Sequence, residues 1–335
     1  MKSLVEAQSG PSTLMSISVA LNTALDAACA RRSDVILLGE DIADPAGGVF
    51  KVTKGLSTKY GAERVRSTPI AEQAIIGAAI GAALGGYRPV AEIMFFDFIT
   101  IAMDQIINHA AKLRYISGGH ASVPITIRTA IGETRFGPQH SQSLEAWFMH
   151  TPGIKVVMPS NPVDAKGLLT ACIEDDDPCL FIENVGLMFS VKEQTPETEY
   201  AIPLGLARIV RAGTDVSLIT YGPMVSVAER VGEKLAQEGI SAEIIDLRSL
   251  VPLDFDTVLG SVERTRRAVV LHEATRFCGP GAEIAAVITE QLFGDLLAPP
   301  LRIGGAFSPR PFTPLGHLPD SDQIVSSVQE LVANS

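Results

Sequence analysis

The chain has 335 residues, of which 46% are hydrophobic and 19% are charged. This length fits two domains better than one, and the apolar content excludes a disordered or low-complexity protein. Twenty-seven basic residues against 38 acidic ones give a net charge of −11. Such a chain repels the phosphates of nucleic acids and anionic lipids, so we expect no nucleic-acid partner.

The cysteines and the apolar stretches of the sequence indicate the cellular compartment. No C-x-x-C pair occurs, so neither a zinc site nor a disulfide framework is indicated, and a reducing cytoplasm is expected. Residues 1–13 contain no apolar core of signal-peptide length, and the longest apolar stretch, residues 74–87, ends at Arg88 before it could span a bilayer. We expect neither export nor membrane insertion.

The first part of the chain alternates between strand-like and helix-like segments. Helical spacing of apolar residues predicts helices over 17–30, 100–115 and 143–148, and buried strands are expected at 34–38, 89–95, 123–129, 153–158 and 178–183. This alternation predicts a parallel sheet covered on both faces.

The same alternation restarts after a polar, proline-containing stretch. Strands are expected at 215–221, 242–247 and 268–272, and helices at 225–238, 255–264 and 281–292. The fold class is therefore α/β, with two doubly wound domains. The predicted division is an N-terminal extension at 1–15, a first domain at 16–190, a linker at 191–204 and a second domain at 205–335.

Acidic residues stand where ligands collect in open α/β sheets, at the carboxyl ends of strands. Glu40, Glu183 and the pair His272-Glu273 occupy such positions. Position alone does not make them catalytic, and for His272-Glu273 we favour a structural or interface role.

Glycines 77, 81 and 85 recur every four residues, which places them on one helical face and permits close approach of another backbone. No G-x-G-x-x-G turn and no phosphate loop of the G-x-x-x-x-G-K-[ST] type is present, so a nucleotide enzyme is disfavoured. Just before them stands Thr68-Pro-Ile-Ala-Glu. Taken alone, Glu72 is a carboxylate that faces the positive end of a helix dipole.

The spacing of Glu72, Gly77 and Gly81 resembles the pyrimidine-binding domain of thiamine-diphosphate enzymes. Nearly the whole chain from about Ser16 is similar to the beta subunit of the E1 component of 2-oxo acid dehydrogenases. The matching stretches follow in the family's order: Leu38-Gly-Glu-Asp-Ile, Arg88-Pro-Val-Ala-Glu-Ile-Met, Met103-Asp-Gln-Ile, Gln139-His-Ser-Gln-Ser, Asp164-Ala-Lys-Gly-Leu-Leu, Ile245-Asp-Leu-Arg and Gly281-Ala-Glu-Ile.

The resemblance implies a thiamine-diphosphate pyrimidine-binding domain followed by a transketolase C-terminal-like domain. It also implies that the cofactor is shared with an E1 alpha subunit, which holds Mg²⁺ and the diphosphate through a Gly-Asp-Gly motif. Here Gly294-Asp295 is followed by two leucines. An α2β2 assembly and a lipoyl-bearing E2 acceptor are the partners that the resemblance implies.

The resemblance also assigns site residues. Glu72 would hydrogen-bond N1′ of the aminopyrimidine and favour its imino tautomer, and His140 would act in proton transfer and acyl transfer to lipoamide, since imidazole titrates near neutral pH. The residues that would line the pyrimidine pocket are Glu40, Ile70, Met94 and Phe98. Without the resemblance, His140 reads as a loop residue and Met94 and Phe98 as core.

A structural potassium ion is a further implication of the resemblance. Its ligands would be the backbone carbonyls of Ile125, Cys172, Asp175 and Asp177. Taken alone, the acidic run at 175–177 is a turn with solvated charges.

Substrate choice rests on finer features. Residues 71–81 and 106–115 look most like acetoin- or pyruvate-type members, and the branched-chain type looks less similar. The loop at 129–139 departs from the family and carries Glu133 and Arg135. We therefore expect cleavage of pyruvate or acetoin with transfer to lipoyl-E2. The alternatives are an acyloin-forming carboligase subunit without lipoamide and a mainly structural partner subunit.

Overall fold

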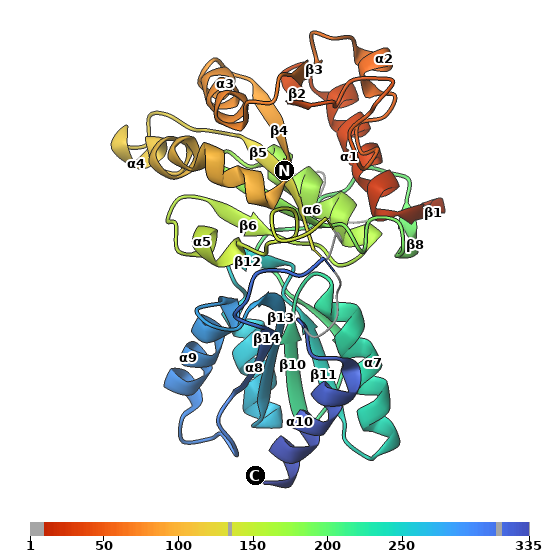
Figure 1. The fold of residues 1–335 in the computed structure, drawn as a ribbon, viewed down its shortest axis with the longest axis vertical. Helices are drawn as coiled ribbons and strands as arrows, with labels where there is room; N and C mark the ends of the chain where they lie inside the picture. Colours follow the sequence, from red (N-terminus) through yellow and green to blue (C-terminus); the bar gives the residue numbers. More distant parts are fainter. Residues whose placement is uncertain (1–9, 133–135, 313–316, 335) are drawn as a thin grey trace.

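The computed structural model describes residues 10–132, 136–312 and 317–334. Two α/β units are stacked along the long axis of the molecule, with the N-terminal unit at the top (Figure 1). The upper unit contains a seven-stranded sheet and the lower one a five-stranded sheet. Within the described ranges, no helix has the length and apolar character needed to cross a bilayer.

The seven-stranded sheet has the order β12-β6-β7-β5-β4-β2-β3, and its strands are parallel except β12. Their bounds are β2 Val35–Glu40, β3 Val65–Thr68, β4 Arg88–Phe95, β5 Thr126–Ile131, β6 Lys155–Val157, β7 Cys179–Asn184 and β12 Ser249–Val251. Every residue of β5 and β7 is buried. This is the burial expected of a parallel sheet covered on both faces.

Helices cover both faces of this sheet. On one face α1 (Ile17–Arg31) and α6 (Pro162–Glu174) share a core with β2 and β7. On the other face α3 (Glu72–Leu84) and the segment after β4 share a core with β4 and β5. Short helices α2 (Leu56–Tyr60) and α5 (Glu145–Met149) complete the unit. The predicted parallel sheet with two covered faces is confirmed.

The five-stranded sheet has the order β14-β13-β10-β11-β9, with only β9 antiparallel among its described strands. Its strands are β9 Arg208–Arg211, β10 Val216–Thr220, β11 Ala242–Asp246, β13 Ala268–Thr275 and β14 Leu301–Gly305. The helices are α7 Met224–Gln237, α8 Phe255–Thr265, α9 Pro280–Leu292 and α10 Ser321–Ala333. The core on one face includes α7 and α10, and the core on the other includes α8 and α9.

One helix differs from the sequence prediction. Residues 100–115 do not form a single α-helix but a 3₁₀ segment η1 (Phe96–Ala102), a π-helical turn η2 (Gln105–Ala110) and a short α4 (Leu113–Ile116). Ile99, Ala102, Ile106 and Ala110 are still buried at helical spacing. The apolar pattern therefore predicted a helix, but it does not specify which backbone hydrogen bonds close each turn.

Six of the described strands lie where none was expected: β3, β9, β12, β14 and a pair of short strands, β1 and β8. Strand β1 (Ser12–Ser16) overlaps the predicted N-terminal extension and pairs antiparallel with β8 (Lys192–Pro196), inside the predicted linker. Polar β8 has no alternating apolar pattern, so its sequence does not indicate a strand. In addition β12, from the range assigned to the second domain, pairs with β6 of the first sheet.

Candidate active site

The candidate site lies where the first sheet changes its direction of winding. From β2 the chain moves outward to β3 and then returns to β4 on the other side of β2. Ligands of open α/β sheets bind at the carboxyl ends of the strands at such a switch point. Glu40 ends β2 and Phe95 ends β4, so the fold itself points to the neighbourhood of the predicted residues.

Glu72 is the first residue of α3 and is only 7% exposed. Among the described residues, no hydrogen bond or ion pair engages its carboxylate. The Thr68 hydroxyl, paired in register with Glu40, is likewise buried without a hydrogen-bond partner in the described part. Burial raises the pKa of Glu40, and the negative charges of Glu72 and Asp41 add to that rise. A buried polar group without a hydrogen-bond partner costs free energy. Glu72, Thr68 and Glu40 are therefore suited to a ligand that can donate hydrogen bonds to them.

Ile70 and Met94 are two of the apolar residues predicted for the pyrimidine pocket. Ile70, two residues ahead of Glu72, is 76% exposed, whereas Met94 near the end of β4 is half-buried. The exposed isoleucine offers apolar surface that nothing in the described part of the chain covers.

His140 lies within a group of aromatic rings. Its ring centroid is 5.1 Å from that of Phe95, 5.3 Å from that of Phe98 and 6.2 Å from that of Phe136, with interplanar angles of 82°, 84° and 71°. These edge-to-face contacts fix the plane of the imidazole. The structure thus brings Phe98 and His140 together, and it adds Phe95, which the sequence analysis did not single out.

Asp97 provides a second connection between the end of β4 and the residues around His140. Its carboxylate accepts hydrogen bonds from the side chain of Gln142, at 2.7 Å, and from its backbone amide, at 3.4 Å. Asp97 is buried, and its other carboxylate oxygen has no hydrogen-bond partner in the described part. The sequence analysis did not identify Asp97. Its position between two phenylalanines after a buried strand indicates a buried carboxylate, and a buried carboxylate can indicate a site.

Glu183, which the sequence analysis weighed as a site residue, belongs to a buried ion cluster. Both its oxygens accept hydrogen bonds from Arg128, at 2.6 and 2.9 Å, and Arg128 also donates to Glu92 at 2.7 Å. Burial raises the pKa of Glu183 to about 7, and the charge of Glu92 adds to the rise, while Arg128 opposes it. Arg128 at the centre of a buried strand could have indicated the cluster, because a buried guanidinium requires carboxylate partners.

His272 and Glu273 are both buried, and each is hydrogen-bonded within the protein. The His272 ring is fully buried, and its Nδ1 lies 2.9 Å from the Ala274 carbonyl. Burial lowers the pKa of His272 to about 4, so the imidazole is neutral at pH 7. Glu273 accepts a hydrogen bond from Asn184 at 3.0 Å, which joins β13 to the end of β7.

Residues 14–189 match the family described as "Transketolase, pyrimidine binding domain", and residues 205–323 match "Transketolase, C-terminal domain". The chain is 47% identical over 329 residues to the acetoin:2,6-dichlorophenolindophenol oxidoreductase subunit beta of Cupriavidus necator, covering 94% of this chain and 97% of that protein. It is 43% identical over 300 residues to the pyruvate dehydrogenase E1 component subunit beta of Bacillus subtilis, covering 89% and 92%.

The chain belongs to the family of E1 beta subunits. A solved structure described as "Split gene transketolase, inactive beta4 tetramer" superposes with a TM-score of 0.79 at 21% identity, covering 97% of this chain and 99% of that one. At this identity the likeness concerns the fold alone, and it agrees with the two-domain α/β class. The pyrimidine-binding domain of the E1 beta family implies thiamine diphosphate as the cofactor.

Overall identity does not rank the branches of the E1 beta family. The 2-oxoisovalerate dehydrogenase subunit beta of Pseudomonas aeruginosa is 45% identical over 316 residues, covering 89% of each chain. A branched-chain-type relative is therefore as similar overall as the acetoin and pyruvate types.

The residues at the switch point fit the pyrimidine half of the cofactor. Glu72 and Glu40 are acceptors without a cationic partner in the described part of the chain, and Ile70 and Met94 add apolar surface beside them. An aminopyrimidine has donors at its edge and apolar faces, which match this combination.

Of the four carbonyls predicted for potassium, those of Ile125 and Asp177 accept hydrogen bonds from Cys179. The Cys179 amide donates to the Ile125 carbonyl at 2.9 Å, its thiol donates to the Asp177 carbonyl at 3.6 Å, and the thiol is also close to that of Cys172. Arg88 donates to the Asp175 carbonyl at 2.9 Å. The carbonyls of Cys172, Asp175 and Asp177 lie at the end of α6 and in the turn before β7, whereas Ile125 precedes β5, and each of the four already accepts a hydrogen bond from the protein.

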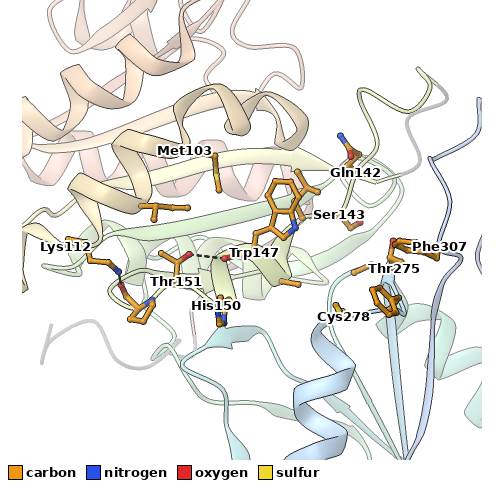
Figure 2. Close-up of a pocket in the computed structure, with 17 residues that line it drawn as sticks. Met103, Lys112, Gln142, Ser143, Trp147, His150, Thr151, Thr275, Cys278 and Phe307 are labelled. Atoms are coloured by element: carbon orange, nitrogen blue, oxygen red, sulfur yellow. Dashed lines mark hydrogen bonds between the residues drawn. The ribbon is translucent and has the colours of Figure 1, made fainter.

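A cavity of about 770 Å³ lies between the two domains and is separate from the predicted residues (Figure 2). Gln142, Ser143 and Trp147 line it from the first domain, and Cys278 and Phe307 from the second. In Figure 2, Gln142 and Ser143 stand at one end of the cavity near Thr275 and Phe307. The cavity therefore adjoins the residues that follow His140. The loop substitutions Glu133 and Arg135 lie outside the described residues.

Proposed function

We propose that this chain is the beta half of a two-chain enzyme that binds thiamine diphosphate against an E1 alpha subunit, cleaves acetoin or pyruvate, and transfers the acyl unit to a lipoyl group on an E2 protein. The observation that carries the proposal is Glu72, a buried carboxylate at the switch point without a partner in the described part of the chain. The acetoin and pyruvate relatives at 47% and 43% identity agree with this substrate class, and the 2-oxoisovalerate relative at 45% makes that compound the third substrate to test.

When bound, thiamine diphosphate supplies a nucleophilic carbon and an electron sink for breaking a bond next to a carbonyl. Glu72 binds and orients the pyrimidine edge by holding a proton between its carboxylate and the ring nitrogen N1′. Glu72 is the first residue of α3, so its carboxylate stands at the positive end of the helix dipole. Glu40 adds negative charge beside it, while Ile70, Met94 and Phe98 shield the ring from water.

His140 is proposed to move a proton at its imidazole during cleavage and acyl transfer. The edges and faces of Phe95 and Phe98 hold the ring at a fixed angle, which limits the directions in which its nitrogens can point. A fixed imidazole is a more effective acid or base than a mobile one, because less orientation is lost in the transition state.

The alpha subunit is proposed to dock over the exposed apolar residues around α3 and α4, in an α2β2 assembly. Ile101, Tyr115 and Ile116 are exposed there in addition to Ile70, and a side chain at Gly81 would meet nothing within 4 Å in the described part. Figure 1 shows α3 and α4 on the same side of the upper unit. Clusters of exposed apolar side chains indicate protein interfaces.

The proposal also covers the Mg²⁺ and potassium ions and the cellular location. Mg²⁺ is assigned to the alpha subunit, since Gly294-Asp295 here continues with leucines. Potassium is assigned to the carbonyls of Ile125, Cys172, Asp175 and Asp177. The cysteines, which form no C-x-x-C pair, support a cytoplasmic location.

The test is to co-purify the chain with an E1 alpha subunit and assay acetoin, pyruvate and 2-oxoisovalerate with a dye as electron acceptor, with and without thiamine diphosphate. Glu72→Gln is expected to lower kcat by at least about 100-fold, as removal of a general acid-base group does. Glu283→Gln is the matched control, because Glu283 is also in a first helical turn but is exposed. Full activity of Glu72→Gln would contradict the proposal.

Transfer to lipoyl is tested separately with a lipoyl domain as acceptor. His140→Gln is expected to slow reductive acylation of that domain more than dye reduction, because the dye bypasses acyl transfer. Acyloin formation without any lipoyl reaction would instead favour a carboligase, and a stable complex that turns over none of the substrates would favour a structural partner.

A further inference from the structure

Both domains hold the residues around His140. We define the His140 segment as residues 136–143. On the first-domain side, Asp97 accepts hydrogen bonds from Gln142. On the second-domain side, Arg310 donates to the Ser143 hydroxyl at 3.1 Å. We propose that Arg310 is a positioning residue, through which the second domain sets the orientation of His140 for the reaction. This inference rests on the proposed role of His140.

Arg310 is itself held rigidly. It is 6% exposed, its Nη2 donates to the Glu273 carbonyl at 2.8 Å, and the same nitrogen is 3.4 Å from the Glu273 carboxylate. The other oxygen of that carboxylate accepts the hydrogen bond from Asn184. A planar guanidinium with several fixed acceptors loses little further freedom when it binds one more. Ser143 is therefore anchored to a fixed point and not to a mobile surface side chain.

Two further side chains, Asn184 and Phe312, lie close to the backbone in or next to the His140 segment. Gly132, just ahead of the segment, has a φ of +113°, and a Cβ there would lie 2.6 Å from the Asn184 amide nitrogen. Gly137 has a φ of +87°, and a Cβ there would collide with the ring of Phe312, two residues after Arg310. Side chains from both domains thus close on the backbone of this part of the chain, at positions where only glycine leaves room.

The consequence for His140 is geometric. Its ring packs against Phe95 and Phe98 of the first domain, whereas its chain is anchored three residues later to the second domain. If the anchor is released, the ring keeps its aromatic neighbours but its backbone can shift. A misplacement of about 1 Å at a reacting group can cost about 100-fold in rate.

The experiment uses the complex with the alpha subunit and compares Arg310→Met, Arg310→Lys and Ser143→Ala with wild type. Arg310→Met is expected to lower kcat about 10- to 100-fold with little change in KM, the pattern of a displaced reacting group. Ser143→Ala, which keeps the Arg310-Glu273 contacts, is expected to lower kcat about two- to tenfold, as loss of one hydrogen bond does. Arg310→Lys retains a charge beside Glu273 and is expected to restore part of the rate.

Arg208→Met is the matched control for general loosening of the domains. Arg208 also comes from the second domain and is 3.5 Å from Asp164 of the first, but none of its ion pairs in the described part reaches the His140 segment. We expect its kcat to stay within about twofold of wild type, because Asp164 keeps its ion pair with Arg248 at 2.7 Å and the lost contacts lie away from the His140 segment.

Two readouts separate positioning from a structural role. Hydrogen exchange of a peptide covering 136–143 is expected to rise in Arg310→Met and Ser143→Ala but not in Arg208→Met. In a double-mutant cycle, the kcat effect of Arg310→Met is expected to shrink to within about twofold when His140 is already glutamine, since coupled residues are not additive.

The outcomes distinguish the two hypotheses. Unchanged exchange in the segment, or kcat losses that multiply in the double variant, would overturn the role of Arg310 while leaving the function of His140 intact. If His140→Gln alone retains full dye reduction and lipoyl transfer, the proposed role of His140 fails, and the positioning proposal fails with it.

Discussion

Arg128→Met tests how the first sheet accommodates two buried carboxylates. The substitution removes the guanidinium that donates hydrogen bonds of 2.6 and 2.9 Å to Glu183 and 2.7 Å to Glu92, while it keeps much of the side-chain volume. Glu183 and Glu92 are 3% and 9% exposed, so water cannot replace those donors. Removing one partner of a buried ion pair costs about 3 to 5 kcal/mol in the free energy of unfolding.

That cost depends on pH in a defined direction. Burial already raises the pKa of Glu183 to about 7, and Arg128 opposes the rise, so the pKa in the variant is higher still. A carboxyl group whose pKa is higher in the folded than in the unfolded state binds more protons when folded, and stability then falls as pH rises through that interval. The variant is therefore expected to be closest to wild type near pH 5.5 and to lose most at pH 8.

The measurement is urea unfolding of the purified chain at both pH values, followed by far-UV circular dichroism and by the fluorescence of Trp147, the single tryptophan. Arg66→Met is the control: Arg66 lies on β3 of the same sheet, its pair with Glu63 is exposed at 3.5 Å, and its loss should cost less than about 1 kcal/mol. An equal loss at both pH values, or a larger loss at pH 5.5, would refute the reasoning.

Two further substitutions test packing and a second buried acid. Gly153→Ala is expected to lose about 1 to 3 kcal/mol of stability, because Gly153 has a φ of +102° and a Cβ would collide with the Ala111 carbonyl; Gly239→Ala, with a φ of +82° but open space, should lose less in the same urea titration. Glu145→Gln is expected to gain stability relative to wild type as pH rises above 4.5, the ordinary pKa of a glutamate. Burial raises the pKa of Glu145, so wild type loses stability as pH rises from the ordinary pKa toward the raised one, whereas the amide does not titrate and still accepts the Tyr221 hydrogen bond of 2.8 Å. A stability difference that does not change with pH would contradict this account.

Much of the architecture could be predicted because apolar patterning is local. Both α/β units, the buried strands and α3 with its leading Glu72 follow from periodicity and strand-helix alternation. Strands β8 and β12 could not be predicted in this way. Each is short, and its pairing depends on backbone hydrogen bonds to a segment far away in the sequence, which no local pattern reports.

The site shows a similar division. Glu72 and His140 were indicated by the family's motifs, but the motifs carry no information about the shell that holds them. Arg310 lies about 170 residues after His140 and contacts its segment through Ser143. Such a contact depends on how two domains pack, so a sequence read along the chain does not reveal it.

Strand β12 has a consequence for attempts to dissect the molecule. Because it covers β6, a fragment ending at residue 204 would expose the backbone donors and acceptors of β6 at a new sheet edge. The complementary fragment would carry a three-residue strand with nothing to pair against. We expect the excised N-terminal half to aggregate and the two halves to be most soluble when co-expressed, so the covalent boundary between the domains does not coincide with a boundary of autonomous folding.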